Sequence, residues 1–100
     1  MEIRFRTKKL QRQYERSDAA VKAYGPEVAR KYVLRVNIIK SAQSIDELRR
    51  LPGLACHELK GDRAGQWAIK LTGFFRLIFT LEGKRLEIVL IEEVSKHYGD

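Results

Sequence analysis

The spacing of apolar residues changes near Gly53, and this change divides the chain into a helical part and a strand part. Before Gly53, apolar side chains recur every three to four residues, which is the spacing of one face of an α-helix. After it, they alternate with polar residues or form short apolar runs, as in strands that are covered on one or both faces. We therefore expect a single α+β domain over residues 1–100, with two or three N-terminal helices packed on one face of a mostly antiparallel, roughly five-stranded sheet.

The helical part is expected to follow a short strand, because residues 2–6 alternate in polarity. Thr7 is placed to cap a first helix that runs to about Ser17. Gly25-Pro26 predicts the start of a longer helix, since proline is tolerated at the first helical position. Residues 44–47, Ser-Ile-Asp-Glu, have the pattern of a capping box and predict one more helical turn.

The strand part is expected to form a meander of four strands. Residues 57–59 predict a short strand, and residues 61–65 a charged, glycine-rich turn. Residues 67–71 alternate, whereas residues 74–81 and 86–94 are apolar on both faces at their centres. The last two segments therefore predict interior strands.

The positive charge is concentrated in the first part of the chain. The net charge is +7, and residues 1–40 contain eleven Lys and Arg against four Asp and Glu. Such an imbalance favours a polyanion or an acidic protein as partner. Lys8, Arg12 and Arg16 lie four residues apart on the first expected helix and form a basic ridge. A solvated helix face would have the same pattern, so the spacing leaves both interpretations open.

Several classes of protein are not expected from this sequence. No apolar run approaches the ~20 residues that span a bilayer, and charges occupy the N-terminal positions where a signal peptide is apolar. We therefore expect a cytoplasmic protein without membrane contact. Cys56 has no second thiol, and the two histidines lie forty residues apart, so neither a disulfide nor a metal or other cofactor is expected.

Arg76 is the most informative candidate for chemistry. It lies inside the run Phe-Phe-Arg-Leu-Ile-Phe, where a strand has no structural need for a charge. One interpretation is an ion pair with Glu87 or Glu92 across the sheet, or a side chain that reaches the sheet edge. The other is a guanidinium that grips a phosphate.

The remaining candidates suit one reaction. If His57, Lys60, Arg63 and His97 converge with Arg76, they offer a base, an acid and cations around a phosphate. These groups are what RNA cleavage requires when the 2′-hydroxyl of the RNA attacks the adjacent phosphate, and this reaction needs no metal.

The segment "LPGLACHELKGDRAGQWAIKLTGFFRLIF" resembles the motif L-P-G-L-x-x-H-x-L-K-G-x-R-x-G-x-W-x-(I/V)-x-(I/V)-x-G-x-(W/F)-R-(I/L)-x-F of the HigB branch of the RelE/ParE superfamily. These proteins are toxins of bacterial type II toxin–antitoxin systems. The resemblance implies a RelE-like fold and an mRNA endonuclease that works on translating ribosomes. It also implies inhibition by a cognate helix-turn-helix, HigA-like antitoxin, with operator DNA bound only through the complex.

The resemblance also assigns roles to individual positions. His57, Lys60, Arg76 and His97 match catalytic or phosphate-stabilising positions. The chain departs from the motif at Lys70, where arginine is common, and in the tail, where His97-Tyr98 reverses the usual order; Tyr98 could stack on a base or hydrogen-bond the nucleotide. Arg63, Lys70 and Tyr98, with Lys8, Arg12 and Arg16 on the basic ridge, are the expected RNA-binding residues.

Two other functions remain open at this point. ParE-like members of the superfamily inhibit DNA gyrase and lack the RNA-cutting residues, which the cluster of Lys60, Arg76 and His97 argues against here. The second alternative is an inactive basic module that only binds its antitoxin.

Overall fold

The computed structural model describes residues 1–96, which form four helices and a five-stranded sheet. In chain order the elements are β1 (Glu2–Phe5), α1 (Lys8–Glu15), α2 (Ser17–Tyr24), α3 (Pro26–Ser41), α4 (Ile45–Arg50), β2 (His57–Glu58), the 3-10 turn η1 (Gly61–Arg63), β3 (Gln66–Lys70), β4 (Phe75–Glu82) and β5 (Ile88–Lys96). The predicted α+β class is confirmed. No helix in the described part of the chain is both long and apolar enough to span a bilayer.

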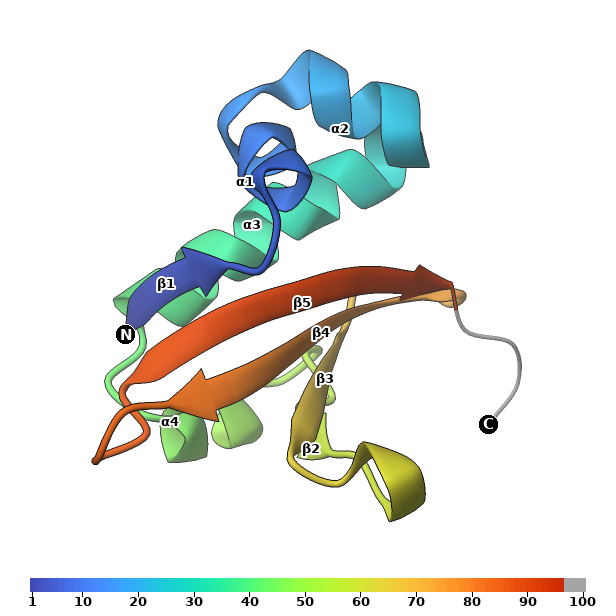
Figure 1. The fold of residues 1–100 in the computed structure, drawn as a ribbon. Coiled ribbons are helices and arrows are strands. Elements are labelled where there is room, and N and C mark those ends of the chain that lie inside the picture. Colours follow the sequence, from blue (N-terminus) through green and yellow to red (C-terminus); the bar gives the residue numbers. More distant parts are fainter. Residues whose placement is uncertain (97–100) are drawn as a thin grey trace.

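The sheet has the strand order β1-β5-β4-β3-β2. Strands β2 to β5 form the expected antiparallel meander, whereas β1 runs parallel to β5. Figure 1 shows the consequence: β1 and the N-terminal helices lie towards one edge of the sheet, and β2 and η1 lie at the other.

The helix starts follow the predicted capping residues. The Thr7 side chain accepts a hydrogen bond from the backbone N–H of Leu10 at 3.1 Å, and Pro26 is the first residue of α3. The first helix is shorter than predicted, because Arg16 has an extended backbone (φ −127°, ψ 110°) that separates α1 from α2. The apolar spacing did not predict α2 as a separate helix.

The capping box is only partly formed. Ser44 Oγ accepts from the backbone N–H of Glu47 at 3.3 Å, as predicted. The Glu47 carboxylate, however, accepts from the N–H of Gln43 and not from that of Ser44. The helix still begins at the predicted place.

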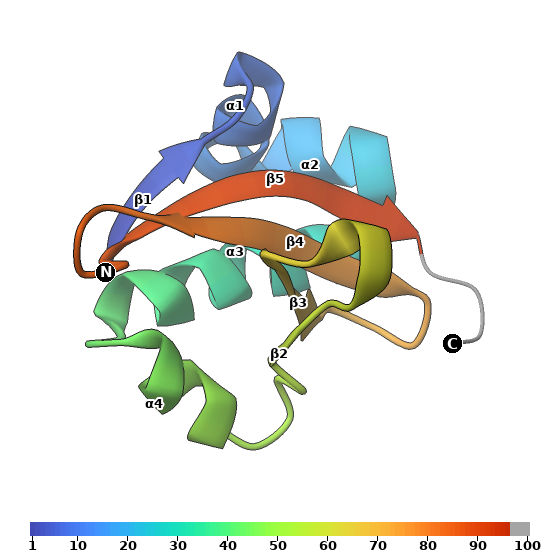
Figure 2. The same ribbon diagram turned by 60° about the horizontal axis from the view of Figure 1, so that its bottom comes forward.

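The hydrophobic core lies between α3 and one face of the sheet. Tyr32, Val36 and Ile39 of α3 are fully buried in one cluster with Phe79 and Ile91. Burial of each such side chain is worth roughly 1.5–3 kcal/mol. Figure 2 shows α3 behind the sheet and η1 in front of it, so the opposite face, here called the open face, is not covered by α3.

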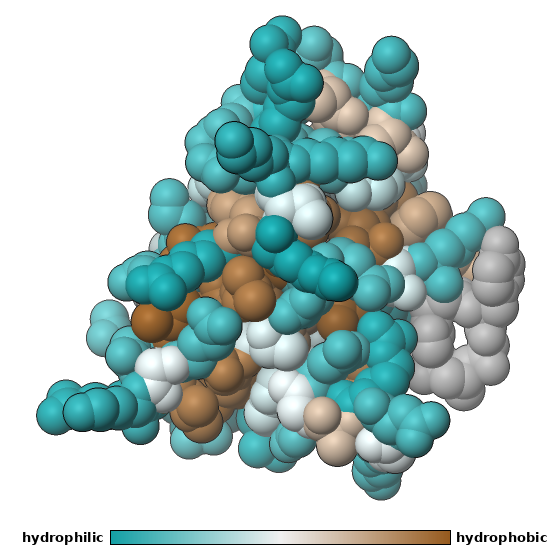
Figure 3. Space-filling model, viewed as in Figure 1, coloured by the Kyte–Doolittle hydropathy of each residue, from teal (hydrophilic) through white to brown (hydrophobic). Residues whose placement is uncertain are grey.

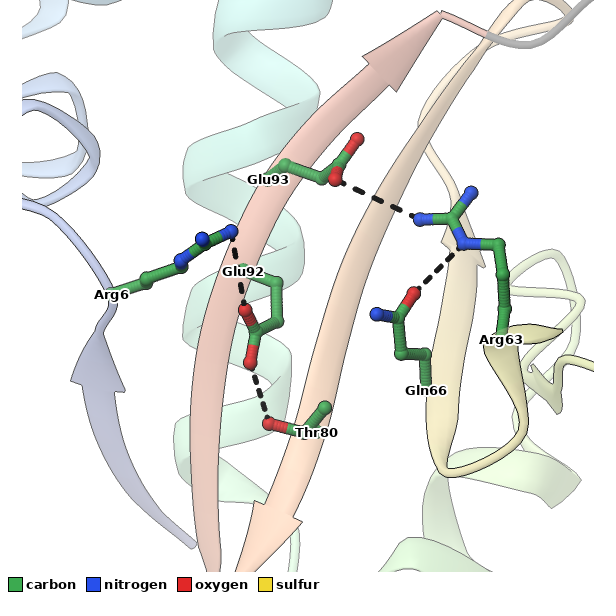
Figure 4. Close-up of polar contacts among 6 residues, drawn as sticks. All are labelled: Arg6, Arg63, Gln66, Thr80, Glu92 and Glu93. Atoms are coloured by element: carbon green, nitrogen blue, oxygen red, sulfur yellow. Dashed lines mark hydrogen bonds and ion pairs between the residues drawn. The ribbon is translucent and has the colours of Figure 1, made fainter.

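A β-bulge gives the open face two successive acidic residues. Ile78 pairs with Glu93, but Phe79 pairs with Ile91, so Glu92 is an extra residue in β5. Because of this irregularity, neighbours in sequence reach the same face, which a regular strand does not allow. Glu92 accepts a hydrogen bond from Thr80, and Glu93 pairs with an arginine of η1 (Figure 4).

Candidate active site

A pocket of about 220 Å³ lies on the open face where β2, β3, β4 and β5 come together. The strand register explains its floor, since His57 lies opposite Ala68, and Ala68 lies opposite Ile78. Its complete lining is His57, Leu59, Lys60, Arg63, Ala68, Arg76, Ile78 and Ser95. Four sequence candidates that are up to nineteen residues apart therefore meet at one site.

The guanidinium of Arg76 is held by backbone carbonyls. Its Nη1 donates to the oxygens of Thr72 at 2.8 Å and Phe75 at 3.1 Å, and lies 3.5 Å from the oxygen of Gly73. Its Nε and Nη2 donate no hydrogen bond within residues 1–96. Arg76 is half-buried at the pocket wall, so these two nitrogens remain available to a bidentate anion.

The alternative of an ion pair across the sheet is wrong for Arg76. Within the described residues it contacts no carboxylate at ion-pair distance. Glu87 accepts instead from the backbone N–H of Arg85, and Glu92 contacts Thr80 and Arg6. The charge of Arg76 is thus uncompensated at the pocket.

His57 is fixed by a hydrogen bond within its own loop. Its Nδ1 lies 2.8 Å from the carbonyl oxygen of Ala55. A carbonyl oxygen only accepts, so Nδ1 carries the proton and the neutral ring keeps its lone pair on Nε2. Ala55 has a φ of 49°, a left-handed conformation that costs a non-glycine residue roughly 1–2 kcal/mol. This strain lies two residues before His57 of the pocket, and strained residues are common at functional sites.

The two cations of the glycine-rich turn differ in their contacts. Arg63 Nε donates to Gln66 Oε1 at 2.9 Å, and its Nη2 lies 3.7 Å from Glu93 Oε2 (Figure 4). The ion pair is exposed, so it is worth about 0–1 kcal/mol. Lys60 precedes η1 and is exposed, and its ammonium makes no hydrogen bond or ion pair inside residues 1–96.

Sequence reasoning did not find Glu93, Gln66 or Ser95. Ser95 lines the pocket because it lies opposite Arg76 in the sheet. The only signal for Glu93 was the pair of successive glutamates in an otherwise apolar strand. A period of two assigns those glutamates to opposite faces, so the bulge was needed to place Glu93 beside Arg63.

The other predicted RNA-binding residues lie outside the pocket. Lys70 is exposed and lies opposite Arg76 in register, so it extends the basic surface beyond the pocket. The basic ridge of Lys8, Arg12 and Arg16 is fully on the surface, near the β1 edge of the sheet, and Figure 3 shows hydrophilic side chains over this region. His97 and Tyr98 lie outside the described residues.

The ridge is interrupted at its last member. Lys8 and Arg12 belong to α1, but Arg16 follows the helix and lies 3.3 Å from Asp18. This hydrogen-bonded arginine lowers the pKa of the Asp18 carboxyl below its usual value. No three His, Cys, Asp or Glu side chains between residues 1 and 96 are grouped as metal ligands would be.

Solved structures with the same fold include several toxins. The chain matches a YoeB/ParE toxin from Agrobacterium tumefaciens with a TM-score of 0.63 and 19% identity, covering 98% of this chain and 100% of that one. It matches a chain of a YoeB–YefM complex from Staphylococcus aureus with a TM-score of 0.63, 14% identity and 98% coverage of both. A YafQ mutant from E. coli matches with a TM-score of 0.61 and 17% identity, over 95% of this chain and 91% of that one. At these identities the likeness establishes the fold.

Sequence comparison identifies the family. No curated protein matches the chain. The sequence profile of the family described as "RelE-like toxin of type II toxin-antitoxin system HigB" matches residues 3–92. That span contains all four helices, β2 to β4, most of β1, the first part of β5 and every pocket residue except Ser95. The chain is therefore a member of the HigB family of RelE-like toxins from type II toxin–antitoxin systems.

Proposed function

We propose that this toxin is a metal-independent endoribonuclease that cleaves mRNA on translating ribosomes. The observation that carries the proposal is the convergence of His57, Lys60, Arg63 and Arg76 on one pocket, although they belong to separate segments of the chain. None of these residues belongs to the hydrophobic core, so folding alone does not require them there.

The groups of the pocket match the steps of RNA cleavage. His57 Nε2 accepts the proton of the 2′-hydroxyl, and the freed oxygen attacks the adjacent phosphorus. Arg76 binds two phosphoryl oxygens through Nε and Nη2 and stabilises the charge that develops on them. Lys60 gives a proton to the departing 5′-oxygen as the bond from phosphorus to that oxygen breaks. The products are a 2′,3′-cyclic phosphate and a 5′-hydroxyl.

The division of labour between the two arginines follows from their contacts. Arg76 is bonded only to backbone carbonyls and needs no rearrangement to bind an anion. A phosphate on the Nε and Nη2 edge of Arg63 would have to replace Gln66 and Glu93. We therefore assign the phosphate of the reacting nucleotide to Arg76, and a neighbouring phosphate to Arg63 and Lys70. His97 keeps the catalytic or phosphate-stabilising role that its motif position suggests, and Tyr98 keeps the contact with the nucleotide.

The basic ridge supports the ribosome as the place of action. Lys8, Arg12 and Arg16 lie towards the β1 edge of the sheet, whereas the pocket lies towards β2. One molecule thus has a catalytic surface for mRNA and a second cationic surface for ribosomal RNA. A toxin that acts on translating ribosomes would be a cytoplasmic protein.

We further propose inhibition by a cognate helix-turn-helix antitoxin, through which the complex binds operator DNA. Membership of a toxin–antitoxin family supports an antitoxin partner. One of the similar structures is a toxin in complex with its partner, YoeB–YefM. The basic helices of this chain would attract an acidic antitoxin segment.

The proposal is tested by inducing the chain in bacteria and mapping mRNA 5′ ends. The variants are Lys60→Ala and Arg76→Ala, and the control is Arg85→Ala, the same substitution in the exposed turn at the far end of β4. We expect new 5′ ends within translated regions for the unaltered chain and the control, and loss of ~10²–10³ in cleavage rate for Arg76→Ala. Unchanged cleavage in both site variants would refute the site. DNA breaks with intact mRNA would instead indicate a gyrase inhibitor. Antitoxin binding without growth arrest would indicate an inactive module.

A further inference from the structure

Phe74 is the most exposed of the large apolar side chains in residues 1–96. Phe74 is 61% exposed, and the other aromatic residues in this part of the chain are partly or fully buried. It lies in the turn between β3 and β4 and takes no part in the hydrophobic core. The next residue, Phe75, begins the pairing of β4 with β5, so the register does not depend on Phe74.

The position of Phe74 relative to Arg76 is fixed by the backbone. Arg76 Nη1 contacts the carbonyl oxygens on both sides of residue 74, those of Gly73 at 3.5 Å and Phe75 at 3.1 Å. A carbonyl oxygen lies within about 3 Å of the next Cα, so the guanidinium is held roughly 6 Å or less from the Cα of Phe74. The exposed turn that carries Phe74 therefore lies beside the guanidinium that would bind an anion.

We propose that Phe74 stacks on a nucleobase of the RNA next to the phosphate bound by Arg76. The inference rests on the proposed function and adds a base-binding subsite to it. An exposed aromatic side chain beside a cationic groove is the usual arrangement for single-stranded nucleic acids, because every base offers a π face. The pocket itself supplies cations and a histidine, and Phe74 supplies the flat apolar surface that a base requires.

The stacked base also gives a source of sequence preference. Phenylalanine has no hydrogen-bonding group, so it discriminates bases by stacking strength and not by their edges. A toxin with this subsite should favour strongly stacking bases beside the cut. Removal of the ring should weaken that preference as well as the rate.

The test is single-turnover cleavage of a defined mRNA on programmed ribosomes, with every cut site counted. The variants are Phe74→Ala, Phe74→Leu and Phe74→Trp, with Arg76→Ala as the site control. Leu86→Ala is the matched surface control, because Leu86 is 50% exposed and lies in the turn at the other end of the sheet. Alanine substitution at a stacking residue should lower cleavage at subsaturating toxin roughly ten-fold. We expect nearly the same loss for Phe74→Leu, which keeps an apolar side chain but has no π face.

The aromatic replacement separates stacking from a structural role. Phe74→Trp should stay within about two-fold of the unaltered chain, and Leu86→Ala should not differ from it. The distribution of cut sites should become more uniform in Phe74→Ala. If Phe74→Ala and Phe74→Leu cleave at the unaltered rate and sites while Arg76→Ala does not, the stacking role is wrong and the proposed function stands. If Arg76→Ala also cleaves normally, the assignment of the site is wrong, and this inference fails with it. If the unaltered chain cuts no mRNA, the proposed function itself fails.

Discussion

Replacement of Arg76 by lysine separates the charge of this residue from its geometry. A unit charge about 4 Å from a phosphoryl oxygen is worth roughly 4 kcal/mol at an effective dielectric constant of about 20. Removal of the charge in Arg76→Ala should therefore cost ~10²–10³ in cleavage rate, with the lower value favoured because the side chain is only half-buried. Arg76→Lys keeps the charge but loses the fork of two free nitrogens, and we expect a loss of about ten-fold.

The contribution of Arg76 to stability can be measured separately from its contribution to cleavage. Arg76 Nη1 contacts the carbonyls of Thr72, Gly73 and Phe75, which lie near the surface and accept from water when the arginine is absent. The net loss should be about 1 kcal/mol at most, or a fall in Tm of no more than roughly 4–8 °C.

The assay is cleavage of ribosome-bound mRNA by purified variants, with Tm measured on the same samples. Arg85→Lys serves as the control, since it makes the same substitution at the other end of β4. Two results would refute the reasoning. One is an Arg76→Lys variant as active as the unaltered chain, because then geometry has no role. The other is a fall in Tm well beyond this range, which would make Arg76 a structural residue.

Three further predictions concern the site border and the core. Glu93→Gln removes the ion pair to Arg63 and should strengthen binding of an uncleavable RNA a few-fold in a filter-binding assay. If Glu93→Gln raises RNA affinity equally in an Arg63→Ala background, the effect does not act through Arg63. Tyr32→Phe removes a buried donor to the Leu10 carbonyl and should lower the free energy of unfolding by ~1–3 kcal/mol in urea denaturation, whereas no change would show that the bond is not needed. Burial raises the pKa of Cys56 to about 11, so between about pH 9 and 11 the folded thiol keeps its proton and the unfolded thiol loses it. The free energy of unfolding should therefore fall as pH rises through this range, measured by urea denaturation. The same fall in Cys56→Ser would show that another group causes it.

Local signals in the sequence were sufficient for most of the fold. Thr7 and Pro26 mark helix starts because capping and proline geometry depend on a few neighbouring residues only. The apolar stripe of α3 and the alternation of β3 predict their buried faces for the same reason. In contrast, the break at Arg16 has no strong local signal, since both flanking segments are compatible with a helix.

The site depended more on contacts between distant residues. The motif and the misplaced charge identified His57, Lys60 and Arg76, and the structure brings them to one pocket. The sequence left open a carboxylate partner for Arg76, whereas in the structure its guanidinium donates to the carbonyls of Thr72, Gly73 and Phe75. The role of Glu93 required the bulge in β5, which no pattern of polarity predicts.

The most direct test of the account is the chemistry of the cut ends. The purified unaltered chain and each of its pocket variants are incubated separately with ribosomes that carry a defined mRNA. The new RNA termini are then identified. The account predicts a 2′,3′-cyclic phosphate and a 5′-hydroxyl, produced by the unaltered chain and by Arg85→Ala but lost or strongly reduced in His57→Ala, Lys60→Ala and Arg76→Ala. Termini with a 5′-phosphate, or equal cleavage by all three pocket variants, would contradict it.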